Sequence, residues 1–254
     1  MRLQDKVAVL TGAGGGIGRA IVSKLVAEGA RVVAADLSAV ELEQLQRDHG
    51  EAVTTLQVDV TDYGQVEGMV RQAVQSFGRL DIVINNAGIA YPKPLLEHDP
   101  VADFDGVTDV NQKGVYYGIL AAARLFRERG TPGVIINTSS VYGQMASELS
   151  FTYNVSKAAV DMMTKCAALE LGPHGIRVCA VAPGRVDTPM LRKYEELGLW
   201  EHIRREQMRN TFTQPEEIAS VVAFLASDEA NCINGCTVNA DDGFSNFKYP
   251  LLAN

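Results

Sequence analysis

The chain has 254 residues, is 46% hydrophobic and carries a formal net charge of −8. This acidic balance, without a basic footprint, argues against a nucleic-acid-binding protein. No segment approaches the roughly 18 continuous apolar residues of a membrane span, and the N-terminus lacks the apolar stretch of a signal sequence. We therefore expect a cytoplasmic protein with no membrane partner. No linker or internal repeat divides the chain, which favours one domain over residues 1–254.

The cysteines and histidines give no metal-binding pattern. Cys232-x-x-x-Cys236 is a spacing that could suggest a metal, but the four histidines are scattered without ligand spacing. We expect the four cysteines to be buried free thiols and predict no metal site.

The first expected strand, residues 6–10, is a short apolar run of the kind buried on both faces. A glycine-rich turn follows over residues 11–18, and residues 19–29 then show helical spacing that ends at a glycine. Glycine N–H groups at a helix N-terminus can hold a pyrophosphate, although an ordinary flexible turn can also be glycine-rich. The strict Gly-x-Gly-x-x-Gly register does not fit. The pattern that fits predicts cofactor contacts at Thr11, Gly12, Gly16, Ile17 and Gly18.

Asp36 ends the second expected strand, residues 31–35. An acidic side chain at this place can accept hydrogen bonds from the adenosine ribose, and it would repel a 2′-phosphate. No basic residue stands at positions 13–17 or directly beside Asp36, so the sequence predicts NAD rather than NADP. Two alternatives stay open: Arg19 lies close enough to reach a phosphate, and Asp36 alone could be a helix cap.

The remaining apolar runs alternate with helical stretches along the chain. Such alternation predicts an α/β fold, a single doubly wound parallel sheet of about seven strands with helices on both faces, known as the Rossmann fold. The expected strands are residues 6–10, 31–35, 53–58, 80–84, 133–138, 176–182 and a seventh near 236–238.

Tyr153 and Lys157 stand four residues apart, so a helix would place them on one face. A tyrosine needs its pKa lowered by roughly three units to exchange protons near neutral pH. An ammonium about 4 Å away, at an effective dielectric near 20, supplies about that much. We therefore expect Lys157 to lower the pKa of Tyr153. Taken alone, the spacing is more typical of an inert surface pair.

With this glycine turn, the run Asn85-Asn86-Ala87-Gly88 and Tyr153-x-x-x-Lys157, the chain resembles the short-chain dehydrogenase/reductase family. The resemblance extends over nearly the whole length. It also includes Asp59-Val60, Asn111, Ser140 three residues before Gly143, and the segment from Pro183 to Met190.

The resemblance implies a catalytic tetrad of Asn111, Ser140, Tyr153 and Lys157. Ser140, rather than Ser139, would hold the substrate oxygen, because it has the family's spacing to the glycine and the tyrosine. Asn111 would break a helix locally and hold a water beside Lys157, although an amide satisfying its own backbone is the simpler alternative. The further cofactor contacts that the resemblance implies, beyond Tyr153 and Lys157, are Asp59, Val60, Asn86, Ala87, Gly88, Pro183, Gly184, Val186 and Thr188.

The polar segment 187–213 is expected to be a helical insertion over the active site, as the family's substrate lid would be. Arg185 could clamp a substrate carboxylate, but a solvated loop charge is the alternative. The expected pocket wall is Tyr91, Val141, Tyr142, Met145, Leu149, Arg185, Met190, Tyr194 and Trp200.

The predicted function is hydride transfer between a nicotinamide cofactor and a secondary alcohol or ketone, with Tyr153 as general acid and base. NAD leans towards alcohol oxidation, and the sequence does not identify the substrate. A non-catalytic NAD-binding sensor or scaffold is the first alternative. A sugar-nucleotide epimerase or dehydratase is the second. The family resemblance implies a homotetramer, with the tail 246–252 docked on a neighbouring subunit or on its own.

Overall fold

The computed structural model describes residues 1–246 and contains a seven-stranded parallel sheet in the order β3-β2-β1-β4-β5-β6-β7. The strands lie within two residues of the expected runs. They are β1 (Val7–Thr11), β2 (Arg31–Asp36), β3 (Val53–Gln57), β4 (Ile82–Asn85), β5 (Gly133–Thr138), β6 (Ile176–Pro183) and β7 (Thr237–Ala240). The predicted fold class is confirmed.

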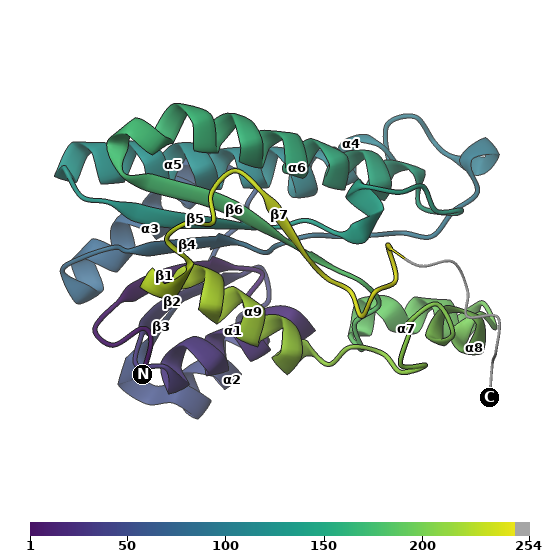
Figure 1. Cartoon of the computed structure of the whole chain (residues 1–254), viewed down its shortest axis with the longest axis horizontal. Helices are drawn as coiled ribbons and strands as arrows, with labels where there is room; N and C mark the ends of the chain where they lie inside the picture. Colours follow the sequence, from purple (N-terminus) through teal and green to yellow (C-terminus); the bar gives the residue numbers. More distant parts are fainter. Residues whose placement is uncertain (247–254) are drawn as a thin grey trace.

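Two layers of helices cover the sheet (Figure 1). One face carries α1 (Gly16–Ala27), α2 (Ala39–His49) and α9 (Pro215–Ala226), and the other carries α3 (Tyr63–Phe77), α5 (Gly114–Arg129) and α6 (Phe151–Leu171). Each layer packs apolar side chains on the sheet. The central strands β1 and β4 are buried throughout, whereas the edge strands β3 and β7 are only partly buried.

The order of the strands creates a crevice beside β1. From β1 the chain passes to β2 on one side, and it later returns to β4 on the other side. The loops after β1 and β4 therefore part at their carboxyl ends, which is where ligands bind in open α/β sheets. The short helix α4 (Asp105–Thr108) precedes α5, while α7 (Pro189–Glu196) and α8 (Trp200–Arg204) lie together at one end of the sheet (Figure 1).

Local sequence explains where the long helices begin and end. The Asp62 carboxylate accepts hydrogen bonds from the N–H groups of Gly64 and Gln65 and so caps α3. Gly78 ends α3 with φ 82° and Gly130 ends α5 with φ 64°, both in the left-handed region that favours glycine.

Candidate active site

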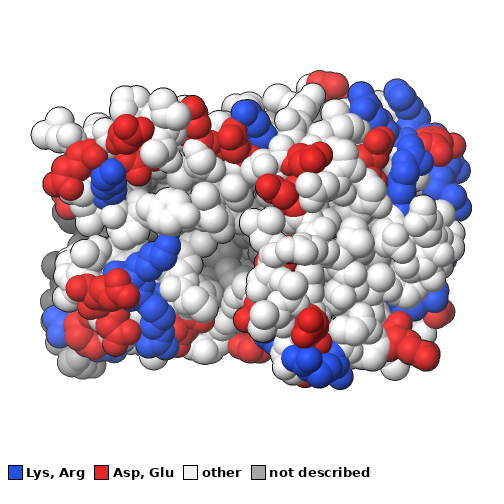
Figure 2. Space-filling view, turned by 180° about the vertical axis from the view of Figure 1, so that it is seen from behind, with Lys and Arg blue, Asp and Glu red and all other residues white. Residues whose placement is uncertain are grey.

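A cavity of about 390 Å³ opens at the carboxyl ends of the strands. It is lined by residues at or just after the ends of six strands, from Gly12 after β1 to Gly184 after β6. Figure 2 shows a face of the molecule that is hollowed near its centre, with mostly uncharged residues around the hollow. The predicted site residues that line this cavity are Gly12, Gly16, Ile17, Gly18, Asp36, Asp59, Val60, Asn86, Ala87, Gly88, Ser140, Tyr153, Lys157, Pro183, Gly184, Val186 and Thr188.

The glycine turn fits the pyrophosphate of a dinucleotide. At the start of α1, the N–H groups of Gly16, Ile17 and Gly18 donate no hydrogen bond within residues 1–246, and the N-cap Gly15 provides no side-chain cap. These N–H groups, at the positive end of the helix, suit an anion. A Cβ atom on Gly18 would lie 2.0 Å from the carbonyl oxygen of Gly12, so the turn can close only with glycine there.

Asp36, the last residue of β2, lines the same cavity. Its Oδ2 accepts a hydrogen bond from the Gly14 N–H at 2.8 Å, and its Oδ1 accepts one from the Ser38 N–H at 3.0 Å. Arg19, which the sequence left as a possible phosphate ligand, instead pairs with Glu41 and lies 3.7 Å from Asp48. Both acids belong to α2, so Arg19 joins the two helices.

Thr11 does not line the cavity. It is 3% exposed, and its Oγ1 accepts hydrogen bonds from the N–H groups of Asn86 at 3.0 Å and Ala87 at 3.2 Å. The Asn86 amide in turn donates to the carbonyl oxygens of Thr11 and Gly12. The expected cofactor contact at Thr11 is therefore replaced by a supporting role, in which this residue fixes the loop after β4 against the glycine turn.

Tyr153, Lys157 and Ser140 meet in the same cavity. Tyr153 and Lys157 project from α6, and the Lys157 Nζ lies 5.6 Å from the centre of the Tyr153 ring. Lys157 is 3% exposed, and its Nζ donates a hydrogen bond to the Thr138 carbonyl oxygen at 2.7 Å. Ser139 also lines the cavity, but its hydroxyl donates to the Lys157 carbonyl oxygen at 3.3 Å, so Ser140 is the serine whose hydroxyl lies beside Tyr153.

The expected lowering of the Tyr153 pKa is wrong for this arrangement. Burial raises the pKa of Tyr153, and the neighbouring Ser140 hydroxyl only partly opposes the shift. Burial also lowers the pKa of Lys157 to about 8, with the charge of Asp161 acting in the opposite direction. Burial is the largest cause of both pKa shifts, although Tyr153 is only partly buried and Lys157 is buried.

Asn111 lies in a single π-helical turn, Asp109–Lys113, between α4 and α5. The expected local break in the helix is thus present. Its Oδ1 accepts from the Ile89 N–H at 2.8 Å, and its Nδ2 donates to the Ile89 carbonyl oxygen and the Ser156 Oγ. Asn111 does not line the cavity. A Cβ atom built on Gly88 would lie 3.3 Å from the Asn111 Oδ1 and 3.4 Å from the Lys157 Nζ, so the two groups flank Gly88.

A buried polar chain that the sequence analysis missed holds α6 on the sheet. The Asn85 Nδ2 donates to the Asn137 Oδ1 at 2.9 Å, and the Asn137 Nδ2 donates to the Thr164 Oγ1 at 2.9 Å. The only sequence signal was an asparagine at or next to the end of each of two otherwise apolar strands, β4 and β5. Because α6 carries Tyr153 and Lys157, these hydrogen bonds help to position both side chains in the cavity.

The far wall of the cavity differs from the expected one. Tyr91, Tyr142, Arg185, Met190 and Tyr194 line it as predicted, but four other residues do not. Val141 is fully buried behind Ser140, and Trp200 packs on Phe212 with ring centres 4.4 Å apart. Met145 and Leu149 line a separate groove. The α7–α8 segment has its own small core, which removes the indole from the pocket.

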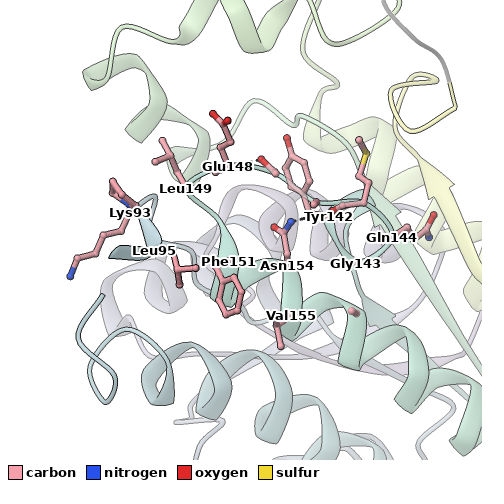
Figure 3. Close-up of a pocket in the computed structure, with 15 residues that line it drawn as sticks. Lys93, Leu95, Tyr142, Gly143, Gln144, Glu148, Leu149, Phe151, Asn154 and Val155 are labelled. Atoms are coloured by element: carbon pink, nitrogen blue, oxygen red, sulfur yellow. Dashed lines mark hydrogen bonds between the residues drawn. The ribbon is translucent and has the colours of Figure 1, made fainter. Parts of the chain in front are cut away.

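This second groove, of about 710 Å³, lies outside the cavity that holds Tyr153. Figure 3 shows that its walls come from the loop at Lys93 and Leu95, the segment from Tyr142 to Leu149, and the start of α6 at Phe151 and Val155.

Within residues 1–246, no cluster of three or more His, Cys, Asp or Glu side chains could hold a metal ion. All four cysteines are free thiols, but only Cys179 is buried. The expectation of four buried thiols is therefore wrong for Cys166, Cys232 and Cys236, which lie at the surface. No helix in the described part of the chain is both long and apolar enough to cross a membrane.

Comparison with known proteins identifies this arrangement. A family model described as Enoyl-(Acyl carrier protein) reductase matches residues 12–245. The chain belongs to the short-chain dehydrogenase/reductase family. It is 39% identical to the 3beta-hydroxysteroid dehydrogenase 2 of Eggerthella lenta over 254 residues, and the match covers 96% of each protein.

Two further relatives agree with this assignment. Levodione reductase of Leifsonia aquatica is 36% identical, with 96% of each protein covered. The solved structure of a 3-ketoacyl-(acyl-carrier-protein) reductase from Brucella melitensis, complexed with NADH, superimposes with a TM-score of 0.89. That match has 32% identity and covers 96% of this chain and 99% of the other. The short-chain dehydrogenase/reductase described here is accordingly a hydride-transfer oxidoreductase that binds a nicotinamide cofactor.

Proposed function

We propose that the protein catalyses NAD-dependent hydride transfer between the cofactor and a secondary alcohol or ketone, with Tyr153 exchanging the proton. The observation that carries the proposal is that Ser140, Tyr153 and Lys157 line the same cavity as the glycine turn and Asp36. A nicotinamide cofactor bound there supplies the hydride acceptor or donor. The remaining tasks belong to the side chains around the substrate oxygen.

In the proposed mechanism, Ser140 hydrogen-bonds the substrate oxygen and Tyr153 transfers a proton to or from it. Because burial raises the pKa of Tyr153, its phenol is protonated near neutral pH and suits donation to a ketone oxygen. Alcohol oxidation needs the phenolate and is expected to gain as pH rises. Lys157 holds the nicotinamide ribose hydroxyls, and Asn111 positions the loop at Ile89 and supports a water route to Lys157.

We assign the remaining predicted contacts to the cofactor in chain order. Gly12, Gly16, Ile17 and Gly18 hold the pyrophosphate. Asp59 and Val60 contact the adenine. The backbone of Asn86, Ala87 and Gly88 lies close to the adenosine part of the cofactor. At the nicotinamide end the contacts come from Pro183, Gly184, Val186 and Thr188.

The proposed preference for NAD rests on the surroundings of Asp36. Both acids of the cavity lining, Asp36 and Asp59, lie at or just after the ends of β2 and β3, where we place the adenosine ribose. Arg19 is already paired with acids of α2. A 2′-phosphate would therefore meet negative charge with no free cation nearby among the lining residues.

A steady-state screen separates a catalyst from an NAD-binding sensor. Purified protein is mixed with NAD and secondary alcohols, or with NADH and ketones, and the NADH absorbance is followed. The panel includes hydroxysteroids, cyclic diketones, 3-oxoacyl thioesters, sugars and hydroxy acids. Turnover of at least one class supports the proposal. Tight NADH binding without turnover of any class would favour the sensor.

We further propose a homotetramer, in which α6 packs on its copy in a second subunit. One face of α6 exposes apolar side chains at heptad-like spacing over its 21 residues, namely Phe151, Val155, Met162 and Leu169. The groove of Figure 3 continues this face at Phe151 and Val155. The tail expected to dock on a neighbour or on its own subunit is 246–252, and all of it beyond Asn246 lies outside the described part of the chain. The lid role of 187–213 and a cytoplasmic location stay predictions.

A further inference from the structure

Arg185 is a cation that the fold places in the wall of the active-site cavity. Only 6% of its side chain is exposed, so it is not the solvated loop charge that the sequence left open. It stands two residues after the end of β6, and its carbonyl oxygen accepts a hydrogen bond from the Thr213 N–H at 3.0 Å. A backbone hydrogen bond and the Glu206 carboxylate thus hold Arg185 in the cavity wall.

Three aromatic rings and one carboxylate surround the Arg185 guanidinium. The guanidinium carbon lies 5.0 Å from the ring centres of Tyr142 and Tyr194 and 6.0 Å from that of Phe244. Its Nε donates to the Glu206 carboxylate at 2.8 Å. Within residues 1–246, its two terminal nitrogens have no hydrogen-bond acceptor, and neither is a fully enclosed atom. Because Arg185 lines the cavity, these nitrogens are available to a ligand there.

The charges of the cavity are divided between its two ends. The acids in its lining, Asp36 and Asp59, lie at the ends of β2 and β3, whereas the cations are Lys157 and Arg185. Burial raises the pKa of Tyr153, and the positive charge of Arg185 works against that shift, so Arg185 acts on the catalytic end. A substrate held at Tyr153 therefore has a second polar anchor within the same pocket.

We propose that Arg185 recognises a carboxylate on the substrate, with its terminal nitrogens donating two parallel hydrogen bonds to the two carboxylate oxygens. The substrate class is then a hydroxy or oxo acid whose carbon skeleton lies against Tyr142, Tyr194 and Met190. This inference rests on the proposed function, since it places the carboxylate relative to the alcohol or ketone at Tyr153. The fork of arginine matches a carboxylate in a way that a lysine does not.

The test measures binding apart from turnover. Calorimetry follows benzoate and benzamide, two probes of the same shape and different charge, into the protein saturated with NADH. We expect benzoate to bind more tightly than benzamide. Arg185→Gln should reduce benzoate affinity by about 10- to 100-fold, the usual worth of a hydrogen bond to a charged group, with little change for benzamide. Glu206→Gln removes the compensating carboxylate and should strengthen the preference for benzoate.

Two further variants keep the test decisive. Arg192→Gln is the matched control, because Arg192 lies on the nearby helix α7 and pairs with Asp187, and neither residue lines the cavity. This variant should leave the ratio of the benzoate and benzamide affinities unchanged. Arg185→Lys keeps the positive charge if the glutamine variant misfolds, and it should lose part of the preference. Equal binding of both probes by the unaltered complex would overturn the inference. The inference would also be overturned if the Arg185 and Glu206 variants lost affinity for benzoate and benzamide equally. In that case the Arg185–Glu206 ion pair would have only a structural role.

A turnover arm separates this inference from the proposed function. The 3- and 4-oxocyclohexanecarboxylates are compared with their carboxamides, using NADH. If the carboxylates are preferred and Arg185→Gln removes the preference, both hold. A benzoate preference without reduction of any ketone in the wider screen would leave carboxylate recognition standing and contradict hydride transfer.

Discussion

At the scale of single residues, the buried ammonium of Lys157 lowers the stability of the folded protein. Its ammonium is almost wholly buried, with one hydrogen bond to the Thr138 carbonyl oxygen, and burial lowers its pKa from 10.5 to about 8. Between these two values the unfolded chain binds a proton that the folded chain does not. Stability therefore rises with pH through this window, and the charged Lys157 lowers stability below it.

Replacing Lys157 by methionine tests that sign. The variant keeps the length of the side chain without the charge. Its free energy of unfolding relative to wild type should fall by roughly 2–3 kcal/mol between pH 7 and pH 10, because the cost of burying the ammonium in the wild type disappears. Urea unfolding of both proteins without cofactor, at several pH values, measures the difference. A difference that does not change with pH would show that burial does not shift the pKa of Lys157.

Asp36 gives a second prediction at this scale. Asp36→Ala should reduce the preference for NADH over NADPH in kcat/KM by about tenfold or more, because a 2′-phosphate no longer meets the carboxylate. Asp36→Asn is the control that separates charge from hydrogen bonding, since its amide oxygen can still accept from the Gly14 N–H. Equal use of both cofactors by wild type would contradict the proposed NAD preference.

At the scale of elements, the glycine turn and α1 were predictable because their constraint is local. A buried strand, glycines and a helix follow one another directly, and the strands themselves are continuous apolar runs. The pocket wall was less predictable, because it depends on contacts between distant segments. Trp200 lies within a small core with Phe212, and the Asn137–Thr164 hydrogen bond joins residues 27 positions apart. The Tyr153 pKa was missed for a similar reason, since burial is a property of the whole fold.

Gly18→Ala tests the closure of this turn. A Cβ atom at Gly18 would overlap the Gly12 carbonyl oxygen, so the turn must open, which should destabilise the protein by about 1–3 kcal/mol and sharply weaken NADH binding. Gly68→Ala in α3 is the matched control, because no atom lies within 4 Å of its added Cβ. That variant should gain about 0.5–1 kcal/mol. Thermal unfolding and NADH fluorescence compare the two, and unchanged NADH binding by Gly18→Ala would contradict the proposed pyrophosphate site.

At the scale of the whole molecule, the exposed apolar face of α6 points to assembly. Met162 is 57% exposed and lies at the middle of this face. Val40, which is 71% exposed, serves as the control because it lies on α2, which covers the opposite face of the sheet. Met162→Asp should dissociate the proposed tetramer, because a buried interface would have to desolvate two or more carboxylates. Val40→Asp should leave it intact. Light scattering at micromolar concentration reads the mass, and a wild-type mass near 27.4 kDa would refute the assembly.

The most direct test of hydride transfer with Tyr153 as the proton-exchanging group is Tyr153→Phe, measured for turnover and for NADH affinity in the same preparation. With any substrate that wild type converts, the variant should lose about 10²–10⁴-fold in kcat, the usual contribution of a positioned proton donor. Its dissociation constant for NADH should change little, since the glycine turn, Asp36 and Lys157 are all retained. Turnover above about a tenth of wild type would contradict the account, because proton exchange would then not depend on this phenol.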